Sequence, residues 1–297
     1  MIHEEVMPDE VAGALVTDPR GLYIDATVST GGHARVLLDR FPGIRLMGVD
    51  WDPGALDVAR ERLRPHHERV ELLHANFARI PEILAGRGER SVCGLLADVG
   101  LSSYALEDPE RGYSYRFPGA PLDMRCDRSE GIRAAEALAR WTEQDLERVF
   151  RTLADIRASR RLARGLAAWR GGRPMETVGD LVEGVRQAMG GRAGPGLLSK
   201  VFQAIRLEFH GDLEHIDRLV TGIGEHVVGG GRLVLLCYQS LEMRTVRAAL
   251  RRLRERHGRP VWTPLMKSSQ APSREEIRRN PRARSARLSA YRKAGGS

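Results

Sequence analysis

The stretch YIDATVSTGGHARVLLDRFPGIRLMGVDWDP, residues 23–53, decides the fold of this chain. It opens with an apolar run that ends at Asp25, passes through a small-residue turn at 29–32 into a helical pattern, and closes with a second apolar run that ends at Asp50. Strand, glycine turn, helix, strand and terminal carboxylate form the first half of a doubly wound nucleotide-binding sheet. An ordinary βαβ unit, in which the glycines only shape a turn, is the alternative interpretation.

Further apolar runs extend this pattern along the chain. Residues 70–74 and 92–98 are expected to be buried parallel strands, and the second of them ends in another acid, Asp98. Residues 131–187 instead show helical patterns, and 202–222 is one long amphipathic segment. The glycines at 229–231 predict a break before a strand at 232–238, and a basic helix at 241–256 follows.

The predicted fold is therefore α/β, with a Rossmann-like, mostly parallel, doubly wound sheet and a helical insertion domain. We expect the first part of the core at 1–107 and the helical insertion, which would recognise the substrate, at 108–198. The second part of the core, with a basic C-terminal segment, is expected at 199–297.

Composition restricts the setting of the protein. The chain has 297 residues, 42% of them hydrophobic, which is enough for a sizeable core. No apolar run approaches the ~18 residues that a membrane span requires, and the acidic N-terminus does not look like a signal peptide. Cys93, Cys126 and Cys237 lack the spacing of a zinc site or a disulfide framework, so we expect no metal and a reducing, cytoplasmic location.

Positive charge is concentrated at the C-terminal end. Residues 244–297 contain 16 Lys and Arg against 3 Asp and Glu, a balance of +13, whereas the whole chain carries +8 and the remainder therefore −5. A basic segment on a mildly acidic body indicates a polyanionic partner such as RNA, although a solvated basic surface would have the same composition. The side chains best placed for RNA phosphates are Arg278, Arg279, Arg282, Arg284 and Arg287.

Several motifs together identify a family. They are DATVSTGGHA (25–34), GVDWDP (48–53), LLADVGLSS (95–103), RGYSY (111–115), PLDMR (121–125), FQAIRLE (202–208), GGGRLVLLCYQSLEMR (229–244) and NPRARSARL (280–288). In this order, and over nearly the whole chain, they resemble the bacterial 16S ribosomal RNA cytosine-N4 methyltransferases (MraW-like), which use S-adenosylmethionine. PLDMR and FQAIR are distinctive, whereas the glycine turn alone would be a weak signal.

The resemblance implies a class I methyltransferase core and a set of site residues. Gly31, Gly32 and His33 would line the methionine end of the cofactor, Asp50 would bind the ribose hydroxyls, and Phe77 would lie near the adenine. Asp98 would stand where the cofactor meets the target base. Without the resemblance, His33 would be read as a packing or capping residue, because no second ligand accompanies it.

Electrostatics favour the same cofactor. S-adenosylmethionine carries a positive sulfonium, which the carboxylates of Asp25 and Asp98 would stabilise. The same carboxylates would repel the anionic pyrophosphate of NAD. The third glycine of the dinucleotide fingerprint is also absent, since the next glycine after Gly32 is Gly43.

Asp98 is the candidate catalytic residue. An exocyclic cytosine amine is a poor nucleophile, so it needs an acceptor that orients it and takes its proton. A capping role for Asp98 is the alternative. Ser102 and Ser103 could assist or could bond their own backbone.

Two further groups have open interpretations. The aromatic side chains of Tyr113, Tyr115 and Phe117 could stack on an unstacked base or pack within their own loop. Glu242 and Arg244 could contact substrate or pair with each other.

Some positions depart from the family pattern. Ser29 replaces a glycine, Ala105 a glutamine, Gln239 a histidine, Met243 an aspartate and His210 an asparagine. A catalytically weak or inactive RNA-binding paralogue, or a methyltransferase with another substrate, is therefore the alternative function. The expected partner is ribosomal RNA or the small ribosomal subunit, and the sequence leaves a monomer and a homodimer both open.

Overall fold

A computed structural model describes residues 5–295, and the chain contacts divide it into two compact units. One unit, called the sheet unit, contains the chain up to Gly100 and again from Leu213 onwards. The other, called the helical unit, is Leu101–Asp212.

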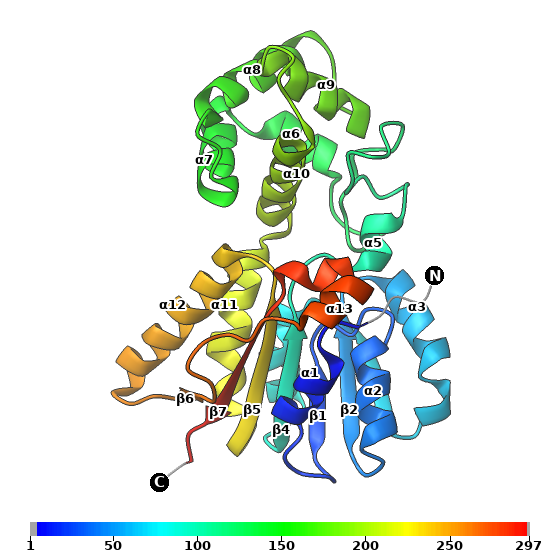
Figure 1. The fold of residues 1–297 in the computed structure, drawn as a ribbon, viewed down its shortest axis with the longest axis vertical. Coiled ribbons are helices and arrows are strands. Elements are labelled where there is room, and N and C mark those ends of the chain that lie inside the picture. Colours follow the sequence, from blue (N-terminus) through cyan, green and yellow to red (C-terminus); the bar gives the residue numbers. More distant parts are fainter. Residues whose placement is uncertain (1–4, 296–297) are drawn as a thin grey trace. The chain divides into compact units, whose positions relative to one another are not determined.

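The sheet unit is built on a seven-stranded sheet in the part of the chain that the structure describes (Figure 1). The strand order is β3-β2-β1-β4-β5-β7-β6, and neighbours from β3 through β5 run parallel, whereas β7 is antiparallel to both β5 and β6. The strands are β1 (Leu22–Asp25), β2 (Arg45–Asp50), β3 (Val70–His74), β4 (Val92–Asp98), β5 (Val227–Cys237), β6 (Trp262–Pro264) and β7 (Arg287–Lys293).

The order of the parallel strands reverses between β1 and β4. Ligands of such sheets bind beyond the carboxyl ends of the strands at this switch point. Asp25 ends β1, Asp50 ends β2 and Asp98 ends β4, so three carboxylates are gathered at this edge.

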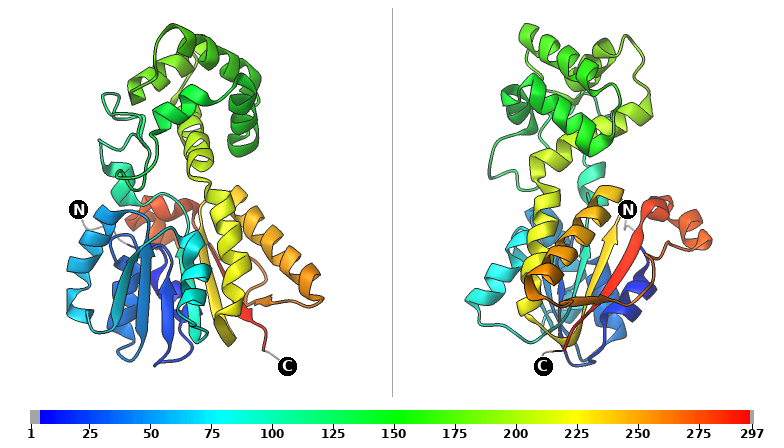
Figure 2. Two further views of the ribbon diagram at one scale, coloured as in Figure 1. Left: turned by 180° about the vertical axis from the view of Figure 1, so that it is seen from behind. Right: turned by 90° about the vertical axis from the view of Figure 1, so that its left-hand side faces the viewer.

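Helices cover both faces of the sheet, and Figure 2 shows them from two further sides. One apolar cluster joins the sheet to α1, α2 and α3, and a second joins it to α4, α11 and α12. These helices are α1 (Pro8–Leu15), α2 (Gly32–Arg40), α3 (Pro53–Arg62), α4 (Ile80–Gly86), α11 (Asp212–Gly222) and α12 (Ser240–His257). The short elements are η1 (Arg64–His66), η2 (Phe77–Arg79), η3 (Ile223–Glu225), α13 (Arg274–Arg279) and η4 (Pro281–Ser285).

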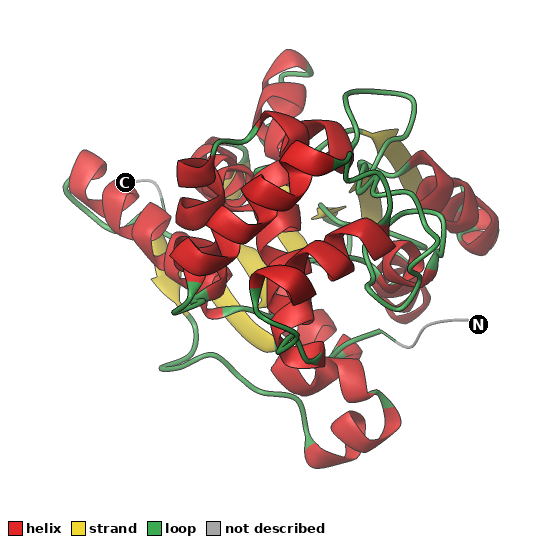
Figure 3. Cartoon of the chain, turned by 90° about the horizontal axis from the view of Figure 1, so that it is seen from above, coloured by secondary structure: helices red, strands yellow, loops and turns green. Residues whose placement is uncertain are grey.

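The helical unit has a core of its own, and helices dominate the regular structure of the chain (Figure 3). Its helices are α5 (Ser103–Glu107), α6 (Ala134–Arg140), α7 (Glu143–Ala154), α8 (Ser159–Gly172), α9 (Val178–Ala188) and α10 (Pro195–His210). It begins before residue 108 and ends after residue 198, because α10 buries Leu198, Val201 and Ile205 in the helical core.

The amphipathic segment at 202–222 is divided between two helices, since Gly211 adopts φ 70° and ends α10 in a left-handed cap that glycine accepts without strain. One local expectation was wrong. The glycines at 229–231 lie within β5 rather than before it. They form an irregularity in the pairing of β4 with β5, and a side chain at Gly231 would approach the carbonyl oxygen of Cys93 to 2.8 Å.

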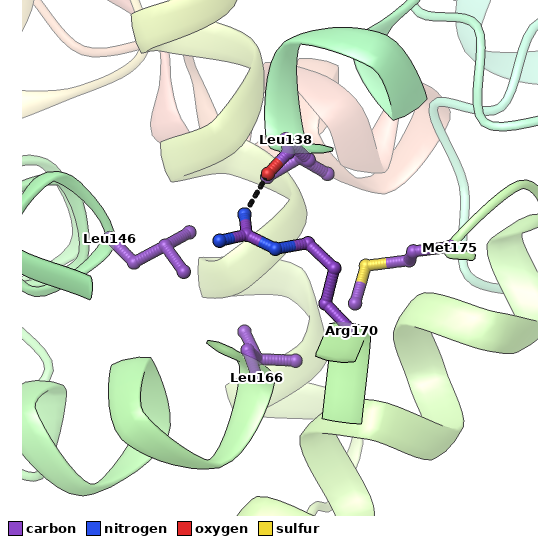
Figure 4. Close-up of a pocket in the computed structure, with 5 residues that line it drawn as sticks. All are labelled: Leu138, Leu146, Leu166, Arg170 and Met175. Carbon is purple, nitrogen blue, oxygen red and sulfur yellow. Dashed lines mark hydrogen bonds between the residues drawn. The ribbon is translucent and has the colours of Figure 1, made fainter. Parts of the chain in front are cut away.

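A small cavity lies inside the helical unit (Figure 4). Its lining is mostly apolar, and the guanidinium of Arg170 crosses it to donate a hydrogen bond to the carbonyl oxygen of Leu138. The lining residues are Leu138, Leu146, Leu166, Arg170 and Met175, none of which the sequence nominated for function.

Candidate active site

The glycine turn joins β1 to α2 in a strained conformation. Ser29 has φ 46°, a left-handed value that a side chain rarely adopts, and Gly31 has φ 83°. The amide of Gly31 donates to the carbonyl oxygen of Val28 at 2.8 Å, and that of Ser29 to Asp50 Oδ2 at 2.8 Å. The family's glycine would hold the Ser29 conformation at lower cost, but serine still forms the turn.

Asp50 ties this turn to the end of β2. Its Oδ2 accepts the amide of Ser29, and its Oδ1 accepts the amide of Asp52 at 2.9 Å. Burial raises the pKa of Asp50 to about 6, although these hydrogen bonds act in the opposite direction. The carboxylate of Asp50, which is predicted to bind the ribose hydroxyls, is thus held in a fixed orientation.

Asp25 is almost completely buried at the end of β1, with 1% of its surface exposed. Burial raises its pKa to about 7, while His33 and the amide of Thr27, 3.2 Å from Asp25 Oδ1, lower it. A buried carboxyl with so high a pKa ionises readily only if a positive charge comes near it.

Asp98 carries an unsatisfied oxygen. Its Oδ1 is buried and has no hydrogen-bond partner among the described residues, whereas Oδ2 lies 4.0 Å from Nδ1 of His33. Burial raises the pKa of Asp98, and the charge of His33 and a hydrogen bond from Tyr238 oppose that rise. The carboxylate therefore contacts other side chains instead of capping a helix, and one oxygen remains available to a donor.

His33 bridges the turn and the N-terminal segment. Its Nε2 lies 2.9 Å from the carbonyl oxygen of Val6, and its ring is 7% exposed. Burial disfavours the imidazolium, but the carboxylates of Asp98 and Asp25 outweigh it and raise the pKa of His33.

Phe77 follows β3 and belongs to an aromatic group. Its ring meets that of His215 edge-on at 6.0 Å, and Trp51, the residue after Asp50, meets the same histidine at 5.8 Å. Asn76 Nδ2 lies 3.1 Å from Nδ1 of His215. Trp51 and His215 were not among the residues predicted for the site, although an aromatic residue directly after Asp50 was a usable signal.

The structure brings most nominated residues together within the sheet unit. Gly31, Gly32 and His33 begin α2, Asp50 binds the turn that precedes α2, and Asp98 lies beside His33. Phe77 is connected to Trp51, the residue after Asp50, through the ring of His215. Thr27 was missed: its Oγ1 accepts the amide of Asp98 at 2.7 Å and connects β1 to β4.

Other candidates have structural roles. Ser102 Oγ accepts the amide of Ala105 at 3.1 Å and caps α5, which is the local role that the sequence left open. Glu242 is 1% exposed and accepts the amides of Tyr238 and Gln239 at the start of α12. Both are explained by helix capping.

The aromatic side chains at the start of the insertion pack within the helical unit. Tyr113 is 5% exposed, and Tyr115 meets Phe202 edge-on at 6.2 Å. The hydroxyl of Tyr113 donates to the carbonyl oxygen of Met124 at 2.8 Å and lies 3.2 Å from Nε2 of His210. His210 is therefore part of a buried polar network of the helical unit.

The site suits a cationic cofactor better than an anionic one. Its glycine turn leads into a helix N-terminus, which favours a carboxylate such as that of a methionine moiety. Around the turn stand the carboxyl groups of Asp25, which is buried, and of Asp50 and Asp98, which are partly buried. All three have raised pKa values, and a nearby positive charge would stabilise their ionised forms. The unsatisfied Oδ1 of Asp98 would lie at the reacting end.

Outside this site, metal binding, membrane crossing and RNA binding each require particular features of the described residues. No group of three or more metal-ligating side chains occurs in residues 5–295, and no helix there is long and apolar enough to cross a membrane. The side chains of Arg278, Arg279, Arg282, Arg284 and Arg287, in α13, η4 and the start of β7, are all exposed.

Comparison with known proteins gives consistent matches. The sequence model of the MraW methylase family matches residues 1–294. A protein of Pseudarthrobacter chlorophenolicus named ribosomal RNA small subunit methyltransferase H is 38% identical over 284 residues, covering 91% of this chain and 86% of its own. The protein of the same name from Sorangium cellulosum is 38% identical over 297 residues, covering 99% and 92%.

Among solved structures, an rRNA methylase of Streptococcus thermophilus aligns with 97% of this chain and 93% of its own. The identity is 14% and the TM-score 0.42. The fold is therefore assigned from the strand order of the sheet and not from this similarity.

Proposed function

Because this chain belongs to the MraW methylase family, we propose that it transfers a methyl group from S-adenosylmethionine to the N4 amine of a cytidine in small-subunit ribosomal RNA. The observation that carries this proposal is Asp98 at the end of β4, a half-buried carboxylate whose Oδ1 is buried and has no hydrogen-bond partner among the described residues. Two curated relatives are named as methyltransferases of small-subunit ribosomal RNA, which supports the same substrate class.

The residues of the turn would hold the cofactor, which supplies an electrophilic methyl group on a positive sulfonium. Amides at the start of α2, from Gly31 to His33, suit the carboxylate of the methionine end. Asp50 would accept the ribose hydroxyls, and Phe77 with its aromatic neighbours would flank the adenine. The negative charges of Asp25 and Asp98 would favour the sulfonium over the neutral product left after transfer.

Asp98 would act on the amine of the target base. Its free Oδ1 would accept one N–H of the N4 amine, fix the orientation of the amine and receive the proton that leaves on methylation. The raised pKa makes Asp98 a stronger base than an exposed aspartate, as long as it is ionised at the working pH. Thr27, His33 and Tyr238 would hold its position.

The base must reach this carboxylate outside a double helix. An enzyme that works on an exocyclic amine receives the base either flipped out or from a single-stranded segment. The exposed arginines of α13 and η4 would bind RNA phosphates and orient the substrate without reading its sequence. Such a substrate places the activity in the cytoplasm.

A second candidate function is RNA binding without efficient catalysis. It is favoured by the positions that differ from the family pattern near β5 and α12. Gln239 forms the N-cap of α12, and Met243 is 8% exposed and packs against Ser289, so neither offers a group for proton transfer.

Two measurements distinguish these functions. Transfer of labelled methyl from S-adenosylmethionine to isolated small subunits, and N4-methylcytidine in ribosomal RNA only of cells that contain the protein, are the expected results. Cofactor binding without transfer would favour the binding paralogue. Transfer to protein or small molecules but not to RNA would indicate another substrate.

A further inference from the structure

Residues 5–7, the N-terminal strap, are bound to three elements around the glycine turn. The carboxylate of Glu5 accepts a hydrogen bond from Arg62 of α3 at 3.0 Å. The carbonyl oxygen of Val6 lies 2.9 Å from His33 Nε2 in α2, and the amide of Met7 donates to Glu276 of α13 at 2.6 Å. Three successive residues thus have separate anchors, which fix the strap in position.

The strap places the carboxylate of Glu5 directly against the glycine turn. A Cβ atom at Gly32 would lie 1.5 Å from Oε1 of Glu5, so the glycine leaves the space that the carboxylate fills. The side chain of Glu5 is 20% exposed, whereas Asp25 is 1% exposed. The side chain of Asp98 is 24% exposed, so Glu5 is about as open to a ligand as Asp98 and more open than Asp25.

Its charge also acts on the reacting end of the site. Glu5 is among the groups that raise the pKa of both His33 and Asp98. It thus belongs to the same electrostatic cluster as the carboxylates of β1 and β4.

The glycine turn alone cannot bind both charged groups of a methionine moiety. Its amides are donors and suit the carboxylate, but an α-ammonium group needs acceptors. Asp50 already accepts two backbone amides, and Asp98 is required for the base. Glu5 is a carboxylate at Gly32, where the methionine end is expected.

We propose that Glu5 is a cofactor-binding residue that accepts the α-ammonium group of the methionine moiety, held in place by Arg62 and by the other contacts of the strap. This rests on the proposed function, because it assumes S-adenosylmethionine at the glycine turn. It adds a residue from outside the βαβ unit to the site and explains why Gly32 lacks a side chain.

The test is calorimetry with two probes on Glu5→Gln. S-adenosylhomocysteine has the ammonium group, and 5′-methylthioadenosine lacks the whole amino-acid end. Since a hydrogen bond between two charged groups is lost, we expect the variant to bind S-adenosylhomocysteine about 10-fold or more weakly. Binding of 5′-methylthioadenosine should change by less than about 2-fold.

Asp9→Asn is the matched control, because it removes a carboxylate of the same chain segment whose side chain is 85% exposed. It should leave both affinities unchanged. Glutamine has nearly the shape of glutamate, and a thermal scan of each variant checks that the fold is retained.

Three results would overturn the proposal. They are unchanged binding of S-adenosylhomocysteine to Glu5→Gln, equal weakening of both probes, and tighter binding, which would make the strap an obstruction. If the unaltered protein bound neither probe, the proposed function itself would fail.

Discussion

Asp98 combines an unsatisfied buried oxygen with a second oxygen close to an imidazole. Asp98→Asn keeps the size of the side chain but removes its charge and its basicity. We expect methyl transfer to fall by about 100-fold or more, as for the loss of a general base. Cofactor affinity should change less than transfer does, because glycine amides and Asp50 remain.

Labelled-methyl transfer and calorimetry on the same preparation separate these two effects. Asp18→Asn serves as the control, because Asp18 is exposed and precedes the start of β1, whereas Asp98 lies at the carboxyl end of β4. Undiminished transfer by Asp98→Asn would rule out the role given to this carboxylate.

The buried carboxyl groups also predict a pH dependence of cofactor binding. Burial raises the pKa of Asp25 to about 7 and that of Asp50 to about 6, so Asp25 becomes mostly protonated and Asp50 partly protonated as the pH falls from 8 to 6. A cationic ligand favours the ionised forms, and its binding therefore releases protons at low pH. The affinity for S-adenosylmethionine should decrease as the pH is lowered through this window.

Calorimetry at pH 6, 7 and 8 measures how steeply the affinity for S-adenosylmethionine changes with pH. For one titrating group the change can reach about 10-fold per pH unit. S-adenosylhomocysteine has no sulfonium charge and should show a shallower slope. Identical slopes for the two ligands would mean that these carboxylates do not respond to the sulfonium.

At the scale of elements, α12 depends on a single buried carboxylate. Glu242 accepts the amides of Tyr238 and Gln239 at 2.8 and 3.0 Å, which are donors that the helix itself leaves unpaired. Glu242→Ala should lower the free energy of unfolding of the sheet unit by about 1–3 kcal/mol, since it leaves buried donors unsatisfied. Thermal and urea unfolding measure this loss.

Glu255→Ala, on the same helix and 67% exposed, should stay within about 0.5 kcal/mol of the unaltered protein. If both substitutions changed the free energy of unfolding equally, the helix cap formed by Glu242 would not stabilise the protein more than an exposed carboxylate does.

Sequence patterns predicted the elements whose structure is determined by the residues within the element itself. The strands β3 and β4 were predicted with their observed bounds. The continuous apolar run of β4 is typical of a parallel strand covered on both faces, whereas β3 is an edge strand without a fully buried residue. The β5 glycines were misread because only the close approach of β4 shows that a strand continues through them. Thr27 and Glu5 were missed for the same reason: each acts on a residue distant in sequence.

At the scale of the whole molecule, the family predicted from the order of the motifs is confirmed by matches over nearly the full chain. The division into a sheet unit and a helical unit is visible in the contacts. The residues that depart from the family pattern are distributed over both units.

The basic C-terminal segment gives a prediction about RNA binding. Arg278 and Arg284 are exposed, so replacing both with Gln should weaken binding of a small-subunit RNA fragment and leave cofactor affinity unchanged. Each lost phosphate contact lowers the slope of log affinity against log salt concentration by about 0.7–0.9.

Filter binding between 50 and 300 mM salt measures that slope, and the double substitution of Arg60 and Arg90, also exposed, is the control. If both pairs changed the slope equally, the C-terminal segment would be an ordinary basic surface.

The hydrogen bond from the amide of Met7 to Glu276 joins residues 269 positions apart. A chain made from its N-terminus emerges with β1, the glycine turn and α2 long before Glu276 has been synthesised. The strap can therefore take its final position only after α13 has left the ribosome. A protein shortened before α13 would keep the βαβ unit of β1, α2 and β2 but lack the hydrogen bond that holds Met7.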